Sequence, residues 1–476
     1  MNDITFNYIT ILTLFCCLVI VFSGFSTKLL CLSFASLFGT YVVGGGALNV
    51  LPGPLVCAFL VGGILISIML RLKINIKKIP YGNVIICFLV YAIIVTLVMP
   101  NLFSNAIQVI RPGYIAEDGI RGTNSLSWTT SNIAQITYFV FDILIVYSLV
   151  SYRMINGNAI QSRVISFNIV IAFTLSVLVM IEFSLCMSGL NVDLFGWFMG
   201  DGFLDPRPDR YALVNALGLP IRRAQAIMGE PSFYSTYMAG IYAVLLYQLR
   251  VKPSVRCGIF FILVLSSLIL AFSTTAIFSV FVISVGVLCA PTGFALAKQN
   301  SKWANKFFLL LIGLILLCLI LYAIFSSEVI FDYIFGKLSN TDGYEEGNYS
   351  SGAERLYWDI TALGALINSY GIGIGAGSTR ASSFFINFIA AFGVVGLVIF
   401  LMVGYKFIAS VYSAKSSIDY MTRSSRILCL GWLVGFIISV PDAFSFFYFW
   451  IGIGITMPLV TFNSEKRFSL HGISND

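Results

Sequence analysis

The run YGNVIICFLVYAIIVTLVM, residues 81–99, decides the fold class of this chain. It carries no charged side chain, and its length matches the ~20 apolar residues that a helix needs to cross the hydrocarbon core of a bilayer. A helix satisfies its own backbone hydrogen bonds, which no water can do in that medium. The run therefore predicts a transmembrane helix.

Similar apolar runs fill most of the chain, which has 58% hydrophobic and 10% charged residues, against about a quarter charged in soluble proteins. We expect an all-α, polytopic transmembrane bundle of about 12–14 helices, with residues 1–476 as a single integral membrane domain. Since only Ser273-Thr274 divides two of the runs, one long tilted helix is the alternative there. The expected helices are 4–23, 28–43, 54–70, 81–99, 134–151, 164–187, 233–249, 257–272, 275–290, 307–325, 383–408, 427–440 and 444–461.

The net charge of +7 is unevenly distributed, because most basic residues fall in short loops that alternation places on one side. Cytoplasmic loops of membrane proteins are enriched in Lys and Arg, so we assign these loops to the cytoplasm, and no nucleic-acid partner is implied. The opposite side then carries the N-terminus and two large extracytoplasmic loops, 188–232 and 326–382, besides a third at 100–133. The basic loops are 71–78, 153–163, 250–256, 298–306, 406–426 and 466–467.

The cysteine and histidine content excludes several kinds of chemistry. All ten cysteines lie in apolar runs, and His471 is the only histidine. We therefore expect no disulfide framework, no Cys- or His-ligated metal, no cofactor and no Ser-His or Cys-His catalysis. Nucleotides are not available on the extracytoplasmic side, so a substrate there has to carry its own activation.

The loop 188–232 ends in Gly229-Glu230-Pro231, which opens a helix. Pro suits the first helical turn, so Glu230 falls at the N-cap, beside a helix end that attracts anions. A carboxylate is the base type that remains for near-neutral pH, which makes Glu230 the first candidate base and Asp209 the second. The alternative is that Glu230 only caps the helix.

Arginines gather in the two large outer loops. The guanidinium fork matches phosphate oxygens bidentately, so these residues are candidate pyrophosphate ligands. Salt bridges to acidic loops or contacts to lipid headgroups are the alternative for each one alone. The candidates are Arg210, Arg222, Arg223, Arg355 and Arg380.

The glycines Gly371, Gly373 and Gly375, followed by Gly377, alternate with small or apolar residues. A dinucleotide site is excluded because no βαβ pattern surrounds them. Either they let the backbone approach a ligand closely, or they give flexibility for packing.

Asp142 and Glu182 lie inside apolar runs. Acids within membrane segments can mark a proton or ion path, which would favour a transporter. A hydrogen-bonded structural role, or a side chain reaching to the membrane surface, is the alternative.

Together these features resemble the O-antigen polymerase and ligase superfamily of bacterial surface polysaccharide assembly. The resemblance is carried by Gly229-Glu230-Pro231-Ser232-Phe233, by Arg355 sixteen residues before Gly371, by Arg207 eleven residues before Gly218, and by the run 387–396 after the second large loop. It covers residues 200–400; the first 200 residues share hydropathy alone.

The resemblance implies a metal- and nucleotide-independent glycosyltransferase of the cytoplasmic (inner) membrane, with its site facing the periplasm. Its substrate is an undecaprenyl-pyrophosphate-linked oligosaccharide, and its partners are membrane lipid and a chain-length regulator protein. The ligases of the superfamily typically carry a histidine in the large outer loop, and 326–382 has none, which favours a polymerase. A ligase, a lipid-linked oligosaccharide flippase or other transporter, and a peptidoglycan glycosyltransferase are the alternatives.

The mechanism expected for a polymerase has arginines stabilising the pyrophosphate leaving group while Glu230 activates the acceptor hydroxyl. Arg355, Arg380, Arg210 and Arg223 are the arginines expected to do so. The site would then lie between the two large loops.

Overall fold

The protein is a bundle of apolar helices. The computed structural model describes residues 8–43, 50–69, 82–111, 122–190, 192–196, 212–214, 220–289, 351–412, 420–440 and 443–457. Within these ranges five helices are long and apolar enough to cross a membrane: α4 (Gly82–Leu102), α5 (Thr130–Asn156), α6 (Ala159–Met187), α15 (Phe384–Tyr412) and α16 (Tyr420–Ser439). The chain is therefore a mostly helical membrane protein.

The other described helices are shorter or more polar. Several are apolar helices of fewer than twenty residues, and α8 is longer but lies almost wholly inside the protein. They are α1 (Tyr8–Phe22), α2 (Phe25–Ala35), α3 (Pro52–Met69), α8 (Pro231–Val251), α9 (Val255–Leu270), α10 (Thr274–Cys289), α14 (Ser351–Asn368) and α17 (Phe447–Thr456), with the 3-10 turns η4 (Ala226–Met228) and η6 (Ala443–Ser445).

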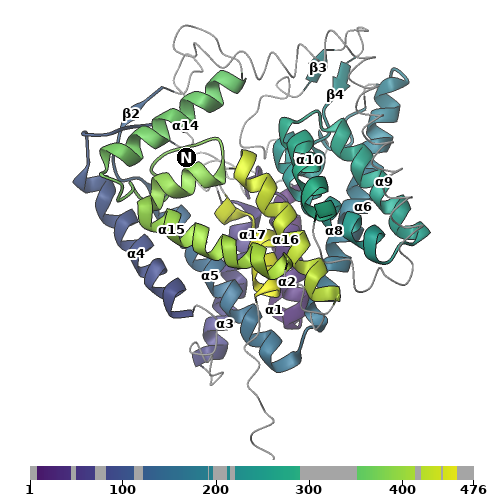
Figure 1. Ribbon diagram of the computed structural model, residues 1–476, viewed down its shortest axis with the longest axis horizontal. Coiled ribbons are helices and arrows are strands. Elements are labelled where there is room, and N and C mark those ends of the chain that lie inside the picture. The colour runs from purple at the N-terminus through teal and green to yellow at the C-terminus, as the bar shows by residue number, and fades with distance from the viewer. Residues whose placement is uncertain are drawn as a thin grey trace, which may run out of the picture.

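The centre of the bundle is the pair α8 and α16, which pack along their length (Figure 1). Glycines make this contact close: a Cβ on Gly431 would lie 2.7 Å from the Cα of Gly240, and one on Gly435 would lie 2.8 Å from the Cα of Thr236. Small residues are what lets two membrane helices approach so closely.

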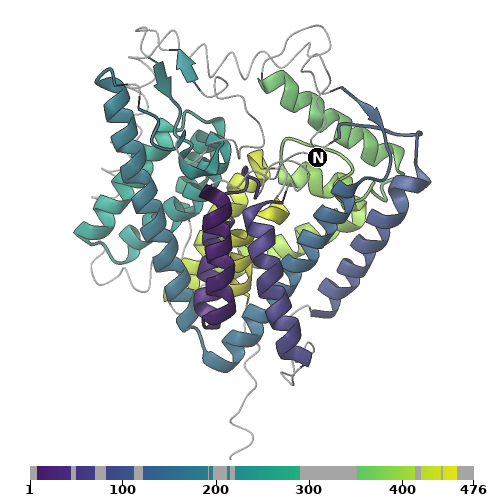
Figure 2. The ribbon, with the colours of Figure 1, turned by 180° about the vertical axis from the view of Figure 1, so that it is seen from behind.

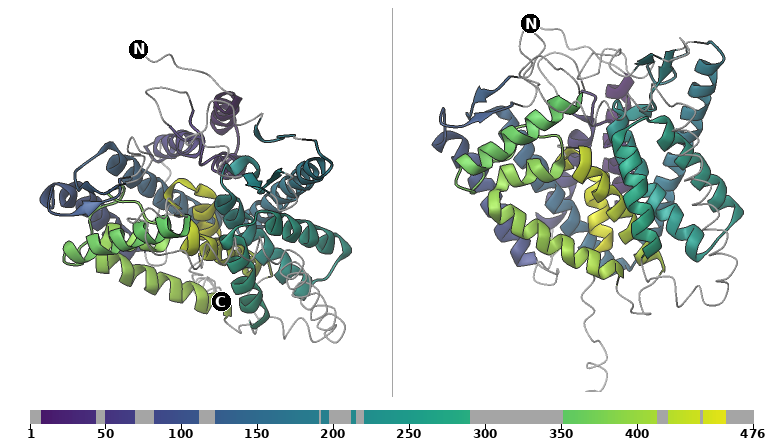
Figure 3. Two further views of the ribbon diagram at one scale, coloured as in Figure 1. Left: turned by 90° about the horizontal axis from the view of Figure 1, so that it is seen from above. Right: turned by 45° about the horizontal axis from the view of Figure 1, so that its top comes forward.

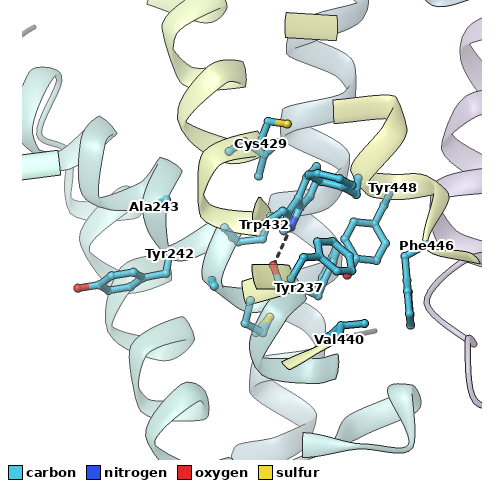
Figure 4. Close-up of a cluster of buried hydrophobic side chains, with 14 of the residues drawn as sticks. Tyr237, Tyr242, Ala243, Cys429, Trp432, Val440, Phe446 and Tyr448 are labelled. Carbon is cyan, nitrogen blue, oxygen red and sulfur yellow. Dashed lines mark hydrogen bonds between the residues drawn. The ribbon is translucent and has the colours of Figure 1, made fainter. Parts of the chain in front are cut away.

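Trp432 fixes the register of this pair. Its indole Nε1–H donates to the carbonyl oxygen of Tyr237 at 2.9 Å, and its ring meets that of Tyr448 at 5.0 Å between centroids (Figure 4). The polar atom of a large buried side chain is thereby satisfied, as burial requires.

The remaining helices surround this pair. α9 and α10 pack on α8, α6 packs on α9, and α5 packs on α3, α4 and α17 (Figures 1 and 2). α15 packs on α16 and bends at Gly393, whose φ is 64°.

Two hairpins and α14 lie at one end of the bundle (Figures 1 and 3). β1 (Gln108–Val109) pairs antiparallel with β2 (Asn124–Ser125), and β3 (Ala212–Val214) pairs antiparallel with β4 (Pro220–Arg222). The hairpins fall in the expected outer loops 100–133 and 188–232, and α14 falls in 326–382. All three loops thus place structure at the same end.

Several expected helix limits differ from the structure. The expected 28–43 ends at Ala35, because the chain then turns so that Thr40 donates its hydroxyl to the carbonyl of Met228 at 2.9 Å. The expected 444–461 is the ten-residue α17 within the described part. The runs at 257–272 and 275–290 form two helices, not one, and 307–325 lies outside the described residues.

Substituting Gly431 by Ala tests the α8–α16 contact. The new Cβ would meet backbone atoms that cannot move aside, the Gly240 Cα and the Ala239 carbonyl at 2.7 and 2.8 Å, so we expect a loss of about 1–3 kcal/mol of stability. Thermal unfolding of the detergent-solubilised protein measures it. Gly258→Ala on α9 is the control, since a Cβ there meets nothing within 4 Å. Equal unfolding temperatures of both variants would refute the close contact.

Candidate functional site

The predicted site residues are described to different extents. Asp209 and Arg210 lie outside the described residues, and for Arg222 the structure describes the backbone, in β4. Glu230, Arg223, Arg355, Arg380 and the glycines are described in full.

The glycine loop 371–377 packs against its own protein backbone. Gly371, Gly373, Gly375 and Gly377 all have positive φ, between 73° and 96°. A Cβ on Gly373 would lie 2.5 Å from the Ala391 carbonyl oxygen, and one on Gly375 would lie 2.7 Å from the Cα of Thr96. Both the left-handed backbone and the close approach need glycine. A contact of these glycines with a ligand stays a prediction.

Hydrogen bonds hold this loop to three helices. Gly375 N–H donates to the Ala391 carbonyl on α15 at 2.9 Å, and Ala376 N–H donates to the Thr96 hydroxyl on α4 at 3.1 Å. The buried Asn132 on α5 donates its Nδ2 to the Ala376 carbonyl at 2.7 Å and to the Ser378 hydroxyl at 2.8 Å. The chain therefore leaves the loop toward residue 380 in a fixed direction.

Arg380 follows the loop and is held by both backbone and side chain. Its N–H donates to the Ile110 carbonyl, beside β1, at 2.8 Å. Its guanidinium carbon lies over the Trp358 ring, 4.5 Å from the centroid, and its Nε is buried without a hydrogen-bond partner among the described residues. A cation on an indole face is favourable, and a guanidinium carries several N–H donors, a group that suits an anion.

Asp359 ties α14 to the chain after Arg380. Ser382 donates its N–H to Asp359 Oδ1 at 2.7 Å and its hydroxyl to Oδ2 at 2.5 Å. Burial raises the pKa of Asp359, while the bonds from Ser382 and the charge of Arg355, one turn earlier on α14, oppose that rise. The tie brings Arg355 and Arg380 into one cluster of charged side chains.

Arg111 adjoins Arg380 through the backbone. It follows Ile110, which accepts the Arg380 N–H, and its Nη2 donates to the Ser125 carbonyl at 2.9 Å and to the Ser127 hydroxyl. Its Nε is buried with no hydrogen-bond partner in the described part of the chain. Arg111 was not expected in the site, because the bond between the Arg380 N–H and the Ile110 carbonyl joins distant parts of the chain and no local pattern indicates it.

Glu230 stands at the start of α8, as predicted. Gly229, with φ of 72°, precedes it, and Pro231 occupies the first helical position. The carboxylate makes no capping hydrogen bond; its Oε2 accepts from the Ser232 hydroxyl at 3.1 Å. Capping therefore does not explain this half-buried carboxylate.

Arg223 has a structural contact that the sequence did not indicate. Its Nε and Nη2 donate to the carbonyls of Ala271 and Phe272 at 3.3 and 2.9 Å, at the C-terminal end of α9. A cation at that end neutralises exposed carbonyls and the helix dipole. Binding of pyrophosphate by Arg223 stays a prediction.

An aromatic cluster links the α8 start to the arginine cluster. Phe233 meets Phe446 at 5.1 Å between ring centroids, Phe446 meets Phe436 at 5.9 Å, and Phe436 meets Phe384 at 6.4 Å. Phe233 is three residues after Glu230, and Phe384 is four after Arg380. Within the described ranges no hydrogen bond, ion pair or ring contact joins Glu230 to Arg355 or Arg380, so a site shared by the two large loops stays a prediction.

The two acids inside membrane segments differ in their surroundings. Asp142 on α5 is fully buried, and neither carboxylate oxygen has a hydrogen-bond partner among the described residues. Glu182 on α6 accepts the Leu194 N–H at 3.2 Å. Asp142 thus keeps the character of a functional candidate, whereas Glu182 has a structural contact.

Comparison of this chain with known proteins identifies no relative. Neither family models, curated proteins nor solved structures give a match to this chain. In the described ranges, no three His, Cys, Asp or Glu side chains are grouped to hold a metal ion.

Substituting Asn132 by Ala tests how the loop is held. The change removes both donors to the loop and leaves the buried Ala376 carbonyl without its partner, so we expect about 1–3 kcal/mol lower stability. Asn156→Ala on the same helix is the matched control, because its amide donates to Tyr152 at an exposed position. Thermal unfolding in detergent should separate the two variants, and equal midpoints would show that Asn132 does not hold the loop.

Proposed function

We propose that this protein is a membrane glycosyltransferase that polymerises undecaprenyl-pyrophosphate-linked oligosaccharides at the periplasmic face of the bacterial inner membrane. The observation that carries the proposal is Arg380 held over Trp358, beside the turn of α14 that carries Arg355, at the end of a membrane bundle. Arg380 is fixed by backbone and ring contacts, yet its Nε has no protein partner in the described part. Planar guanidinium groups held in this way are suited to a pyrophosphate.

The reaction proposed is a direct transfer. A hydroxyl oxygen of the acceptor sugar attacks the anomeric carbon of the donor glycan and forms the new glycosidic bond. The bond from that carbon to the pyrophosphate oxygen breaks, and the lipid pyrophosphate leaves with the electron pair. The hydroxyl proton passes to a carboxylate base. Arg355 and Arg380 stabilise the negative charge that develops on the leaving group, which is the role of preorganised cations.

Two carboxylates are available for the proton. Asp359 lies in the arginine cluster, but Ser382 donates to both of its oxygens, which favours a holding role. Glu230 accepts a hydrogen bond from Ser232, on one of its two oxygens, and three ring contacts from Phe233 to Phe384 separate it from the segment of Arg380. We therefore keep Glu230 as the base in this proposal.

Surface polysaccharide made by variant cells tests the function. In a strain that lacks its own copy of this gene, Arg355→Ala, Arg380→Lys and Glu230→Gln should each shift the glycan from long chains toward single repeat units. Loss of one preorganised donor typically costs about 10²–10³ in rate. Lysine keeps the charge of Arg380 but not the planar group over Trp358.

The control for these variants is Arg256→Ala. This arginine also stands over an aromatic ring, Phe260 at 5.3 Å, but on α9 away from the cluster. If all three site variants still make long glycan chains, the assignment of these residues is wrong. Short chains from Arg256→Ala as well would show that the assay reports stability alone.

A transporter is the second candidate, and the buried, unpartnered Asp142 is the observation that favours it. The same assay separates the two functions. If Asp142→Asn removes all external glycan, the chain moves lipid-linked glycan across the membrane. A polymerase without its activity leaves single repeat units on the surface.

A further inference from the structure

Helix α14 has one face buried in the protein and one apolar face outside it. The buried face is formed by Glu354, Trp358, Ala362 and Ala365, and the buried Ser369 follows the helix. The outward face carries residues spaced by four, three and four positions, which aligns them along one side of a helix. They are Leu356, Ile360, Leu363 and Ile367, exposed by 38%, 59%, 37% and 74%. We call these four the α14 stripe.

The stripe continues onto two helices that are long enough to span the membrane. At the end of α14, the exposed Tyr370 packs against Phe103, which follows Leu102 at the end of α4, with 6.4 Å between ring centroids. The next residue, Gly371, lies against Val394 on α15, since a Cβ there would be 3.1 Å from Val394 Cγ2. Both Leu102 and Val394 are more than half exposed.

The outer sides of α4 and α15 are apolar along their length. In a protein that spans a bilayer such sides meet the acyl chains. The exposed residues are Val90, Ile94, Leu97 and Val98 on α4 and Val395, Val398 and Leu401 on α15. Tyr370 and Gly371 thus join the stripe to these two apolar sides, and exposed apolar residues that adjoin in this way mark a surface that a partner or lipid covers.

The direction of α14 is compatible with a helix that lies in the plane of the membrane–water interface. It lies across the end of the bundle instead of prolonging α4 or α15 (Figure 1). Its other contacts are with α15 and with β1, which follows α4. Tyr370, an amphipathic aromatic residue exposed by 85%, extends the stripe, as is common where a protein meets the lipid headgroups.

We propose that α14 is an interfacial helix, with the stripe Leu356, Ile360, Leu363 and Ile367 lying on the acyl chains at the bilayer surface and the Arg355–Asp359 side at headgroup depth. The partner is the phospholipid surface itself, bound through apolar area as amphipathic helices are. The proposal holds whether or not the chain is a glycosyltransferase. Its consequence is that the arginine cluster sits at the depth where phosphate groups of membrane lipids lie.

Spin-label accessibility measures this depth. Single cysteines at Ile360 and Ile367 would be introduced into a chain whose native cysteines are replaced, labelled with a nitroxide, and placed in phosphatidylcholine–phosphatidylglycerol vesicles. We expect high access to oxygen and low access to a water-soluble nickel chelate. Val398→Cys on α15 is the lipid-facing reference, and Asn368→Cys, exposed beside the stripe, is the water-facing control.

Two results would overturn the proposal. Nickel access at Ile360 and Ile367 equal to that at Asn368 would place the stripe in water, and exclusion of both reagents would mean that protein covers it. If the cysteine-free chain does not fold, a diazirine amino acid at position 360 of the native chain gives the same answer. Photocrosslinks to phospholipid are expected, and crosslinks to protein alone would refute the proposal.

Discussion

Close backbone contact at glycine is the constraint on which this structure depends. It operates in the bundle centre, where Gly431 and Gly240 bring α16 onto α8, and in the loop 371–377, whose glycines lie against α4, α5 and α15. In the bundle centre, the close packing of small residues holds the helices together, because lipid provides no hydrophobic driving force for helix association. In the loop 371–377, it fixes the direction in which the chain reaches Arg380. One physical device therefore determines both the bundle and its charged end.

The charged end is built from segments far apart in the sequence. Residues of the β1 region, of α14 and of the chain before α15 meet around Trp358, through the Arg380–Ile110 and Asp359–Ser382 bonds. Trp358 is buried under a guanidinium, so its ring supports the arginine. If α14 lies on the bilayer surface, this cluster faces the layer in which a lipid-linked pyrophosphate would be found.

Apolar run length predicted most helices well, because the bilayer leaves a chain few options. The runs at 81–99 and 164–187 became α4 and α6 with slightly wider limits. α14 was not predicted. Its apolar residues recur at helical spacing within a polar loop, and no uninterrupted apolar run there is long enough to indicate a transmembrane helix. The N-cap position of Glu230 followed from Pro231. The bond partners of Arg223 and the bond between Ile110 and Arg380 arise from tertiary packing, which no local pattern contains.

The most direct test of the function uses purified protein in lipid nanodiscs with a synthetic undecaprenyl-pyrophosphate-linked repeat unit. The account predicts lengthened lipid-linked glycan and one free undecaprenyl pyrophosphate for each bond formed, with both products lost in Arg380→Lys. Unchanged substrate with the folded wild-type protein, or equal product from the variant, would contradict it.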